Sequence, residues 1–285
     1  MTAFRLACVQ ATTGNDMAAN LAAACAAGRS ARDGGADLIA YPEVVAMMEP
    51  DRALAVQKAA PAADHPALRA FQALAAETGA WVLAGSITVR HADGTLGNRS
   101  YLLDAGGGIV ASYDKIHMFD VDLAGGESYR ESATYRPGSE AVVADTPWGR
   151  LGMTVCYDLR FPHLYRDLAK AGADFLSVPS AFTVPTGEAH WHVLLRARAI
   201  ETGAWVFAPA QCGTHAGGRR TYGHSLVVDP WGRIVADGGD APGITFADID
   251  PAAVATARRA VPSLTHDRPY GPTAPAATAR RAAGG

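Results

Sequence analysis

The two halves of this 285-residue chain repeat one plan, and this repeat constrains the fold more than any other feature. Four segments of the first half return in the same order in the second half: 5–9 in 150–156, 35–43 in 172–180, 79–84 in 203–208 and 100–111 in 225–236. One such match between short apolar segments could arise by chance, but four in one order are hard to dismiss. The period is far too long for a solenoid. We therefore expect two similar β-rich halves whose sheets pack face to face, with helices outside.

Apolar runs and helical periodicities alternate along the chain. The runs predict strands at 4–9, 36–41, 81–89, 100–104 and 151–155. The periodic segments predict helices at 20–31, 68–78 and 161–170. Alternation of this kind is typical of the α/β class.

The composition indicates a soluble globular protein with a sizeable core, since 49% of residues are hydrophobic and 19% are charged. A net charge of −3 gives no reason to expect nucleic acid or a membrane surface as partner. We see neither an apolar run long enough to span a bilayer nor a signal peptide. Cys8, Cys25, Cys156 and Cys212 are too widely spaced for a disulfide framework, so we expect a cytoplasmic location.

Cys156 lies where a strand is followed by a helix. The strand predicted at 151–155 ends just before it, and Asp158 occupies an expected N-cap position for the helix at 161–170. Backbone N–H groups and a helix dipole at such a junction favour the thiolate. Cys156 is therefore a candidate nucleophile, although cysteines are also common as inert core residues.

Glu43 and Lys115 also follow predicted strands, and ligands of α/β proteins gather at the carboxyl ends of strands. The counterpart of Glu43 in the repeat is Ser180, so the fold itself does not need a carboxylate there. Taken singly, these residues read as a loop acid and a surface lysine. With Cys156, however, they supply a base, an oxyanion-stabilising cation and a nucleophile, which suffices for acyl transfer from an amide.

Three motifs carry a family resemblance: residues 41–43, 113–120 and 155–162. The chain resembles the nitrilase, or carbon–nitrogen hydrolase, superfamily from about residue 4 to residue 270. The resemblance implies a four-layer α-β-β-α sandwich with an internal pseudo-twofold, formed by one domain at 1–270. It also implies a homodimer that packs the helical layer containing the nucleophile's helix against its mate. Residues 271–285 have the composition of a low-complexity tail.

The resemblance also assigns roles to residues of the site. It implies Glu43 as general base, Lys115 as oxyanion group and Cys156 as nucleophile. It further implies that Glu131 orients Lys115 and that the backbone N–H of Tyr157 completes an oxyanion hole. No metal or cofactor is expected, and the expected partner is a small-molecule amide.

Further motifs resemble the branch of the superfamily that hydrolyses ω-amides of 2-oxo acids: 179–182, 186–191, 194–202, 211–213, 220–225 and 227–232. This resemblance implies deaminated glutathione as substrate, cleaved to 2-oxoglutarate and Cys-Gly. 2-Oxoglutaramate, N-carbamoyl compounds and aliphatic amides are alternatives. Ser180, Phe182 and His190 are expected to contact the substrate. Glu188 departs from the branch, which usually has proline there, and adds a carboxylate that could disturb a pocket for anions.

A 2-oxo acid substrate needs a cationic group one acyl length from the nucleophile. Arg160 lies four residues past Cys156, about one helical turn away, and its planar fork suits a carboxylate. The alternative is a structural salt bridge from Arg160 to Asp158 or Asp167. In that case the carboxylate partner is sought elsewhere, among Arg196, Arg198 and Arg220.

Three rival hypotheses remain open. In a Cys–His hydrolase, a histidine would activate Cys156, and the candidates are His163, His190, His192, His215 and His224. A zinc site could use Cys212 and His215 with His190 and His192, but the paired motif typical of zinc sites is absent. A non-catalytic binding scaffold of the same fold would be expected to lose Glu43, Lys115 or Cys156, and the chain keeps all three.

Overall fold

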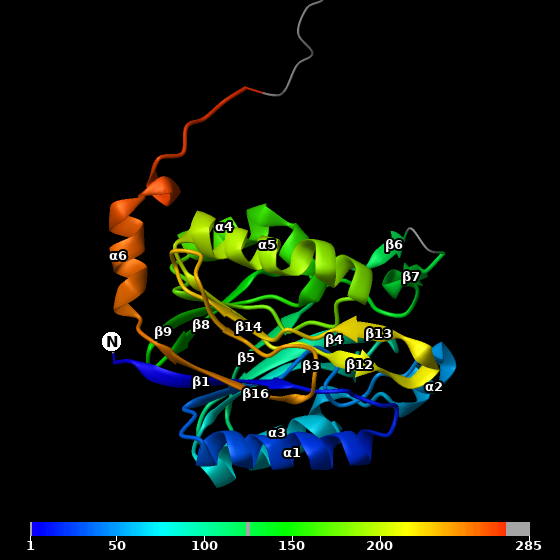
Figure 1. Ribbon diagram of the computed structural model, residues 1–285. Helices are drawn as coiled ribbons and strands as arrows, with labels where there is room; N and C mark the ends of the chain where they lie inside the picture. Colours follow the sequence, from blue (N-terminus) through cyan, green and yellow to red (C-terminus); the bar gives the residue numbers. More distant parts are fainter. Residues whose placement is uncertain (1, 124–125, 272–285) are drawn as a thin grey trace, which may run out of the picture.

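The computed structural model describes residues 2–123 and 126–271, so the expected tail at 271–285 lies almost entirely outside the described residues. Two six-stranded sheets pack face to face between two layers of helices (Figure 1). The expected α-β-β-α sandwich is therefore confirmed. Six α-helices are described: α1 (Met17–Asp33), α2 (Arg52–Lys58), α3 (Pro66–Thr78), α4 (Pro162–Lys170), α5 (Val184–Thr202) and α6 (Ala252–Ala260).

The first sheet has the strand order β16-β1-β2-β3-β4-β5. Its strands are β1 (Phe4–Gln10), β2 (Leu38–Ala40), β3 (Trp81–Arg90), β4 (Leu96–Leu103), β5 (Ile109–Asp114) and β16 (Gly243–Ile249). The second sheet has the order β15-β14-β11-β10-β9-β8. Its strands are β8 (Val142–Thr146), β9 (Gly149–Met153), β10 (Phe175–Ser177), β11 (Trp205–Ala208), β14 (Leu226–Val228) and β15 (Ile234–Asp237).

The two sheets have the same topology, which confirms the internal repeat. In the first sheet β1, β2 and β3 pair in parallel, and β4 and β5 continue antiparallel. In the second sheet β9, β10 and β11 pair in parallel, and β14 and β15 continue antiparallel. Each sheet gains one antiparallel edge strand, β16 beside β1 and β8 beside β9.

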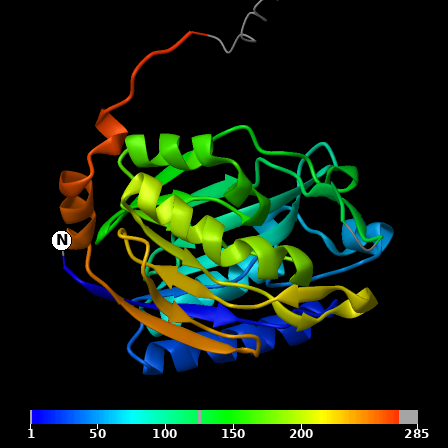
Figure 2. The same cartoon turned by 45° about the horizontal axis from the view of Figure 1, so that its top comes forward.

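Alternation along the strands explains the layers. On β1, Leu6 and Cys8 belong to the core between the two sheets, whereas Ala7 and Val9 belong to the core beneath α1 and α3. Side chains of period two thus bury both faces of the sheet. Helices α4 and α5 cover the second sheet and lie side by side in both views (Figure 2).

Two small hairpins extend from the sandwich at the end that also carries α2 (Figure 1). One pairs β6 (Asp120–Asp122) with β7 (Ser128–Arg130), and the other pairs β12 (Cys212–Thr214) with β13 (Arg220–Tyr222). Short 3₁₀ turns lie at Ala62–Asp64, Glu131–Ala133, Cys156–Arg160, Ala216–Gly218 and Ser263–Thr265. The hairpins matter because their residues line the cavity described below.

The prediction that Asp158 caps the helix after Cys156 is wrong. A 3₁₀ turn occupies Cys156–Arg160, and α4 begins only at Pro162, with Phe161 in the N-cap position. Proline suits the first helical position because its missing N–H has no partner there in any case. Asp158 is buried inside the preceding turn instead.

Gly85 on β3 allows the segments that follow β2 and β10, one from each sheet, to approach it closely. A Cβ atom at this position would lie 1.9 Å from the Tyr41 carbonyl oxygen and 2.7 Å from the Cβ of Pro179. We predict that Gly85→Ala lowers the free energy of unfolding by at least the ~1–3 kcal/mol typical of overpacking, because backbone atoms must move. Urea denaturation measures this change. Gly243→Ala is the matched control, since no atom lies within 4 Å of its added Cβ; equal stability of both variants would contradict the prediction.

Candidate active site

Glu43, Lys115 and Cys156 meet in one cavity of about 330 Å³. Glu43 follows β2, Lys115 follows β5 and Cys156 follows β9, so all three lie just beyond the carboxyl ends of strands. The cavity thus lies where the two sheets end, and the loop before α2 and both small hairpins complete its walls. Its size is typical of small-molecule sites.

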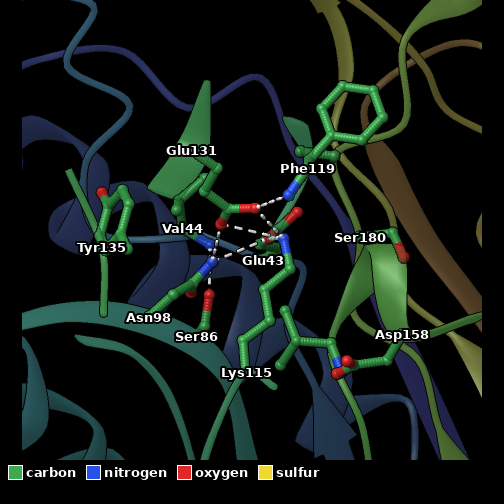
Figure 3. A network of polar contacts seen from close by, with 12 residues as sticks. Glu43, Val44, Ser86, Asn98, Lys115, Phe119, Glu131, Tyr135, Asp158 and Ser180 are labelled. Atoms are coloured by element: carbon green, nitrogen blue, oxygen red, sulfur yellow. Dashed lines mark hydrogen bonds and ion pairs between the residues drawn. The ribbon is translucent and has the colours of Figure 1, made fainter. Parts of the chain in front are cut away.

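Lys115 is held between two carboxylates (Figure 3). Its Nζ donates hydrogen bonds to Oε1 of Glu43 at 3.0 Å and to Oε2 of Glu131 at 2.7 Å. The Nδ2 of Asn98 also bridges the two acids, at 2.9 Å from Glu43 and 3.2 Å from Glu131. The backbone N–H of Phe119 donates to Glu131 at 2.7 Å. This network fixes the ammonium at the floor of the cavity.

Mutual pairing keeps the buried base and the buried lysine charged. Burial by itself raises the pKa of Glu43, but the Lys115 ammonium, hydrogen bonds from Cys156 and Lys115, and the charge of Arg219 together lower it below its ordinary value. Burial by itself lowers the pKa of Lys115, but the charges of Glu131 and Glu43 raise it well above its ordinary value. At neutral pH the site therefore holds a carboxylate and an ammonium.

The thiol of Cys156 rests in its protonated form, so the expectation of a favoured thiolate is wrong. Burial and the neighbouring Glu43 charge raise the pKa of Cys156 above its ordinary value, and Lys115 offsets only part of this. The helix dipole acts too far away, because α4 begins six residues later, at Pro162. Glu43, the carboxylate that can remove the thiol proton, lines the same cavity as Cys156.

Backbone in the left-handed region lies at Cys156 and directly after Glu43. Cys156 has a φ of 51°, and Val44, directly after Glu43, has a φ of 50°. Left-handed φ values are unfavourable for a β-branched residue and cluster at functional sites. The backbone N–H of Val44 donates to Ser86 Oγ at 2.9 Å, and Gln211 Nε2 donates to the Glu43 carbonyl at 2.9 Å. These bonds hold the Glu43 loop in its strained conformation.

Asp158 joins the Cys156 turn to the Lys115 loop. Its Oδ2 accepts hydrogen bonds from the Tyr113 hydroxyl at 2.7 Å and from the Val155 N–H at 2.9 Å. Its Oδ1 accepts from the backbone N–H of His117 at 3.0 Å and lies 2.7 Å from the Nδ1 of the same residue. Asp158 thus ties together the two segments that carry the nucleophile and the ammonium.

The residues expected to contact substrate divide into two groups. Tyr157 and Phe182 line the cavity, and the N–H of Tyr157 has no partner within its 3₁₀ turn because it lies near the turn's start. Ser180 is buried outside the lining, and its hydroxyl donates to the Val178 carbonyl at 2.9 Å. Arg160 and His190 lie outside the cavity lining, and the Nη1 of Arg160 is 3.2 Å from the Nδ1 of His190. The contact expected of these two residues with substrate remains a prediction.

The other charged residues considered above also lie away from the cavity lining. Glu188 is exposed on α5. Arg198 donates to the Leu159 carbonyl from both Nε and Nη2, and Arg196 donates to the Gly232 carbonyl. Arg220 is exposed on β13. Arg160 forms neither of the salt bridges weighed for it, because Asp158 is bonded as described and Asp167 is not its partner among the described ion pairs.

The histidines do not support a Cys–His pair. Within the described part of the chain, no histidine lines the cavity. His215 bonds to Thr13 and Thr221, and His163 packs against His117 and Phe161. The zinc set considered above is not assembled either, because His192 lies with His224 and Asp237 rather than with Cys212.

Three cavity or site residues were not singled out by the sequence patterns: Asn98, Asp158 in its present role, and Arg219. Asn98 bonds to Glu43 and Glu131, and Asp158 bonds to Tyr113 and His117, which flank Lys115 in its motif. Arg219 lies in a glycine-rich turn beside Arg220, and nothing local distinguishes the two.

In the described residues, no helix is long and apolar enough to cross a membrane.

Comparison with known proteins identifies the class of this protein. The carbon–nitrogen hydrolase family model matches residues 5–259, so the chain belongs to that family. The deaminated glutathione amidase of Yersinia enterocolitica is 45% identical over 232 residues, which are 78% of this chain and 81% of that protein. Family and relatives together make this an amide-hydrolysing enzyme.

Solved structures of similar proteins share the fold of this chain. The NitFhit protein of C. elegans superimposes with a TM-score of 0.87 at 36% identity over 93% of this chain, which covers 65% of that longer protein. A glutamate-to-leucine variant of the amidase from Nesterenkonia sp. AN1 has a TM-score of 0.77 at 27% identity, covering 90% of this chain and 94% of that one. That structure shows covalent addition of the acetamide moiety of fluoroacetamide at the active-site cysteine.

Proposed function

We propose that this enzyme hydrolyses deaminated glutathione to 2-oxoglutarate and Cys-Gly through a thioester on Cys156. The observation that carries the chemistry is a single cavity that holds the Cys156 thiol together with a charged Glu43 carboxylate, whose Oε1 lies 3.0 Å from the Nζ of Lys115. The substrate follows from relatives of 41–45% identity that bear the name deaminated glutathione amidase. The cysteine adduct in the Nesterenkonia amidase supports the same choice of nucleophile.

Acylation begins when the Cys156 sulfur attacks the amide carbonyl and its proton passes to Glu43. Negative charge then develops on the carbonyl oxygen, where Lys115 Nζ and the Tyr157 N–H stabilise it. Glu43 next delivers the proton to the amide nitrogen, the C–N bond breaks and the amine leaves. The acyl group remains on sulfur as a thioester.

In deacylation, water is the nucleophile and the Cys156 sulfur is the leaving group. Glu43 takes a proton from a water molecule, and the hydroxide attacks the thioester carbonyl. The tetrahedral intermediate collapses, the C–S bond breaks, and the sulfur regains its proton. Lys115 stays charged throughout because Glu131 and Asn98 hold the network while Glu43 changes its protonation state.

A substrate comparison tests this proposal. We expect the purified enzyme to release Cys-Gly from deaminated glutathione with a higher kcat/KM than it releases ammonia from 2-oxoglutaramate, N-carbamoyl amino acids or pentanamide. Mass spectrometry and an ammonia assay provide the two readouts. A preference for 2-oxoglutaramate would make this enzyme an ω-amidase and leave the thioester chemistry standing. A lack of turnover on every amide would favour a binding scaffold.

We also propose that the enzyme acts as a homodimer in the cytoplasm. Val193 and Ile200 are 67% and 55% exposed and lie two turns apart on one face of α5. Ile200 lies next to Gly232, which follows the exposed Trp231 in the turn between β14 and β15. This apolar face suits packing of the α4–α5 layer against its mate. The cysteines Cys8, Cys25, Cys156 and Cys212 are free thiols, which suits a reducing compartment.

Light scattering after gel filtration tests the dimer. We expect the wild-type mass to be that of two chains, and the Val193→Glu/Ile200→Glu double variant to be a monomer, because the charges cannot be buried unpaired. Ile109→Glu is the control, since Ile109 is 50% exposed on β5, away from α5. A monomeric wild type, or a double variant that stays dimeric, would refute this interface.

A further inference from the structure

Two histidines and an aspartate converge on the surface of the sandwich. His192 lies on α5, His224 lies in the loop between β13 and β14, and Asp237 ends β15. One nitrogen or oxygen atom from each of the three side chains lies within 4.8 Å of those from the other two. None of the three residues lines the cavity that holds Cys156. The cluster is therefore separate from the catalytic residues.

Asp237 contacts both imidazole rings at once. Its Oδ2 lies 3.0 Å from the Nε2 of His192, and its Oδ1 lies 2.9 Å from the Nδ1 of His224. The side chains of the two histidines are 28% and 26% exposed, so both are partly buried and still reachable from solvent. Two ring nitrogens thus face one carboxylate at a position that a small solute can enter.

The backbone around His224 fixes the direction of its ring. His224 has a φ of 55°, which is uncommon for a residue other than glycine. Its N–H donates to the Gly239 carbonyl at 2.6 Å, and its carbonyl accepts from the Nε1 of Trp191 at 2.8 Å. The ring of Tyr222 stacks on the imidazole, with the centroids 4.5 Å apart. These contacts orient His224 independently of its hydrogen bond to Asp237.

The other two members of the cluster are oriented by neighbours as well. The N–H of Gly239 donates to the Oδ1 of Asp237 at 2.9 Å. His192 directly follows Trp191, whose side chain is buried and joins α5 to the β13–β14 loop. Outer contacts of this kind are typical of metal ligands, because they hold the donor atoms in place before the ion binds.

The three side chains are a donor set that suits zinc. Zn²⁺ prefers imidazole nitrogen and carboxylate oxygen at about 2.0–2.2 Å, whereas Mg²⁺ and Ca²⁺ prefer sites made of oxygen. Donor atoms of one tetrahedral zinc ion lie about 3.4 Å apart at these bond lengths. The separations in the cluster are close enough that small side-chain rotations reach this geometry. A neutral histidine can carry its proton on either ring nitrogen, so each ring can offer the facing nitrogen to a metal ion.

We propose that His192, His224 and Asp237 bind a zinc ion, with water in the remaining position, and that the ion fastens α5 to the β13–β14 loop. Glu188 lies four residues before His192 on the same side of α5, and its negative charge favours a cation there. Both α5 and the β12–β13 hairpin contribute residues to the wall of the catalytic cavity. The ion would therefore hold two parts of this wall together.

A zinc titration tests the site. The starting protein is the full chain with Cys156→Ala, freed of metal with a chelator, so that the reactive thiol cannot compete for the ion. Calorimetry should show one equivalent of Zn²⁺ bound with a Kd of about 10 µM or lower. His192→Gln, His224→Gln and Asp237→Asn should each weaken binding by more than the roughly 10- to 100-fold that is lost with an outer contact of a metal ligand. His266→Gln is the matched control, because His266 is exposed and lies outside the cluster, and it should bind zinc like the starting protein.

Thermal melting gives a second readout. Zn²⁺ at about 100 times its Kd should raise the Tm of the starting protein by about 5 °C and should leave the Tm of the three cluster variants unchanged. Melting in chelator shows whether each variant is folded before zinc is added. Asp237→Asn keeps the shape of the side chain, so it serves as the test if a histidine variant does not fold.

Three results would overturn the proposal. One is a folded cluster variant that binds zinc as tightly as the starting protein. Another is a starting protein that binds no zinc at about 1 mM Zn²⁺. The third is Mg²⁺ binding with the same affinity as Zn²⁺, which would mean that charge alone attracts cations to this surface. Failure of the enzyme on every amide would overturn the proposed function only, because neither readout involves turnover.

Discussion

Cys156→Ser should lower kcat by several orders of magnitude while leaving the fold intact. The replacement is nearly isosteric, but the hydroxyl is a much weaker nucleophile in a site whose base is a carboxylate. In the wild type, mass spectrometry of acid-quenched reactions should find the acyl group on the peptide that carries Cys156. The same peptide from the serine variant should carry none under these conditions.

Cys25→Ser is the matched control for this experiment. Cys25 lies on α1, half-buried and outside the cavity lining, so its loss should leave kcat unchanged. Circular dichroism and thermal melting should show both variants folded. Turnover by Cys156→Ser at close to the wild-type rate would remove Cys156 from the mechanism and reopen the question of the nucleophile.

Glu43→Gln and Lys115→Met should both abolish most activity, but only the lysine variant should lose much stability. Glu43→Gln removes the base, which is worth about 10²–10⁴-fold in rate. It leaves Lys115 paired with Glu131 at 2.7 Å, so the buried charge stays compensated. Lys115→Met leaves the buried Glu43 and the partly buried Glu131 together without their cation, which should cost about 3–5 kcal/mol of the free energy of unfolding.

The pH dependence of the lysine variant should shift in a defined direction. Lys115 is the main influence that lowers the pKa of Glu43 against its burial. Without Lys115 that pKa rises, so Glu43 takes up a proton at a higher pH. Residual activity should therefore begin to fall at a higher pH than in the wild type when the solution is acidified, as kcat/KM profiles can measure. Unchanged acid limbs would show that Glu43 is not the group whose deprotonation activity requires.

The Glu43→Gln/Lys115→Met double variant completes the cycle. When two residues act as one unit, replacing both lowers kcat/KM far less than the product of the two single effects. We therefore expect the double variant to be little less active than the worse single variant, and more stable than Lys115→Met because it buries one carboxylate fewer. Full additivity in kcat/KM would mean that base and ammonium act at separate steps.

The internal repeat shows what local patterns can determine. Each repeated segment contains its own apolar run, and such a run predicts a buried strand whatever lies around it. Two packed sheets with helices outside followed from these runs, since strands apolar on both faces must be covered on both faces. Glu43, Lys115 and Cys156 could be grouped as a site for a related reason, because the carboxyl ends of neighbouring strands meet at the same edge of a sheet.

The residues that the patterns missed depend on contacts between distant segments. Tyr113 bonds to Asp158 across 45 residues, and Arg219 bonds to Ala181 across 38. Arg219 and Arg220 are neighbours of identical chemistry, yet only the register of the β12–β13 hairpin decides which one turns into the cavity. No local period encodes that choice.

The charge state of the site was likewise decided by tertiary structure. From the strand-to-helix junction alone, Cys156 should favour its thiolate, because a helix N-terminus attracts negative charge. Packing places the thiol in a buried site beside Glu43 and begins α4 only at Pro162, so desolvation and a like charge raise its pKa instead. The order of residues along the chain determined the fold and the three reactive side chains. Which of them holds the proton, and which of Arg219 and Arg220 lines the cavity, depended on burial and on partners that only the packed sandwich brings together.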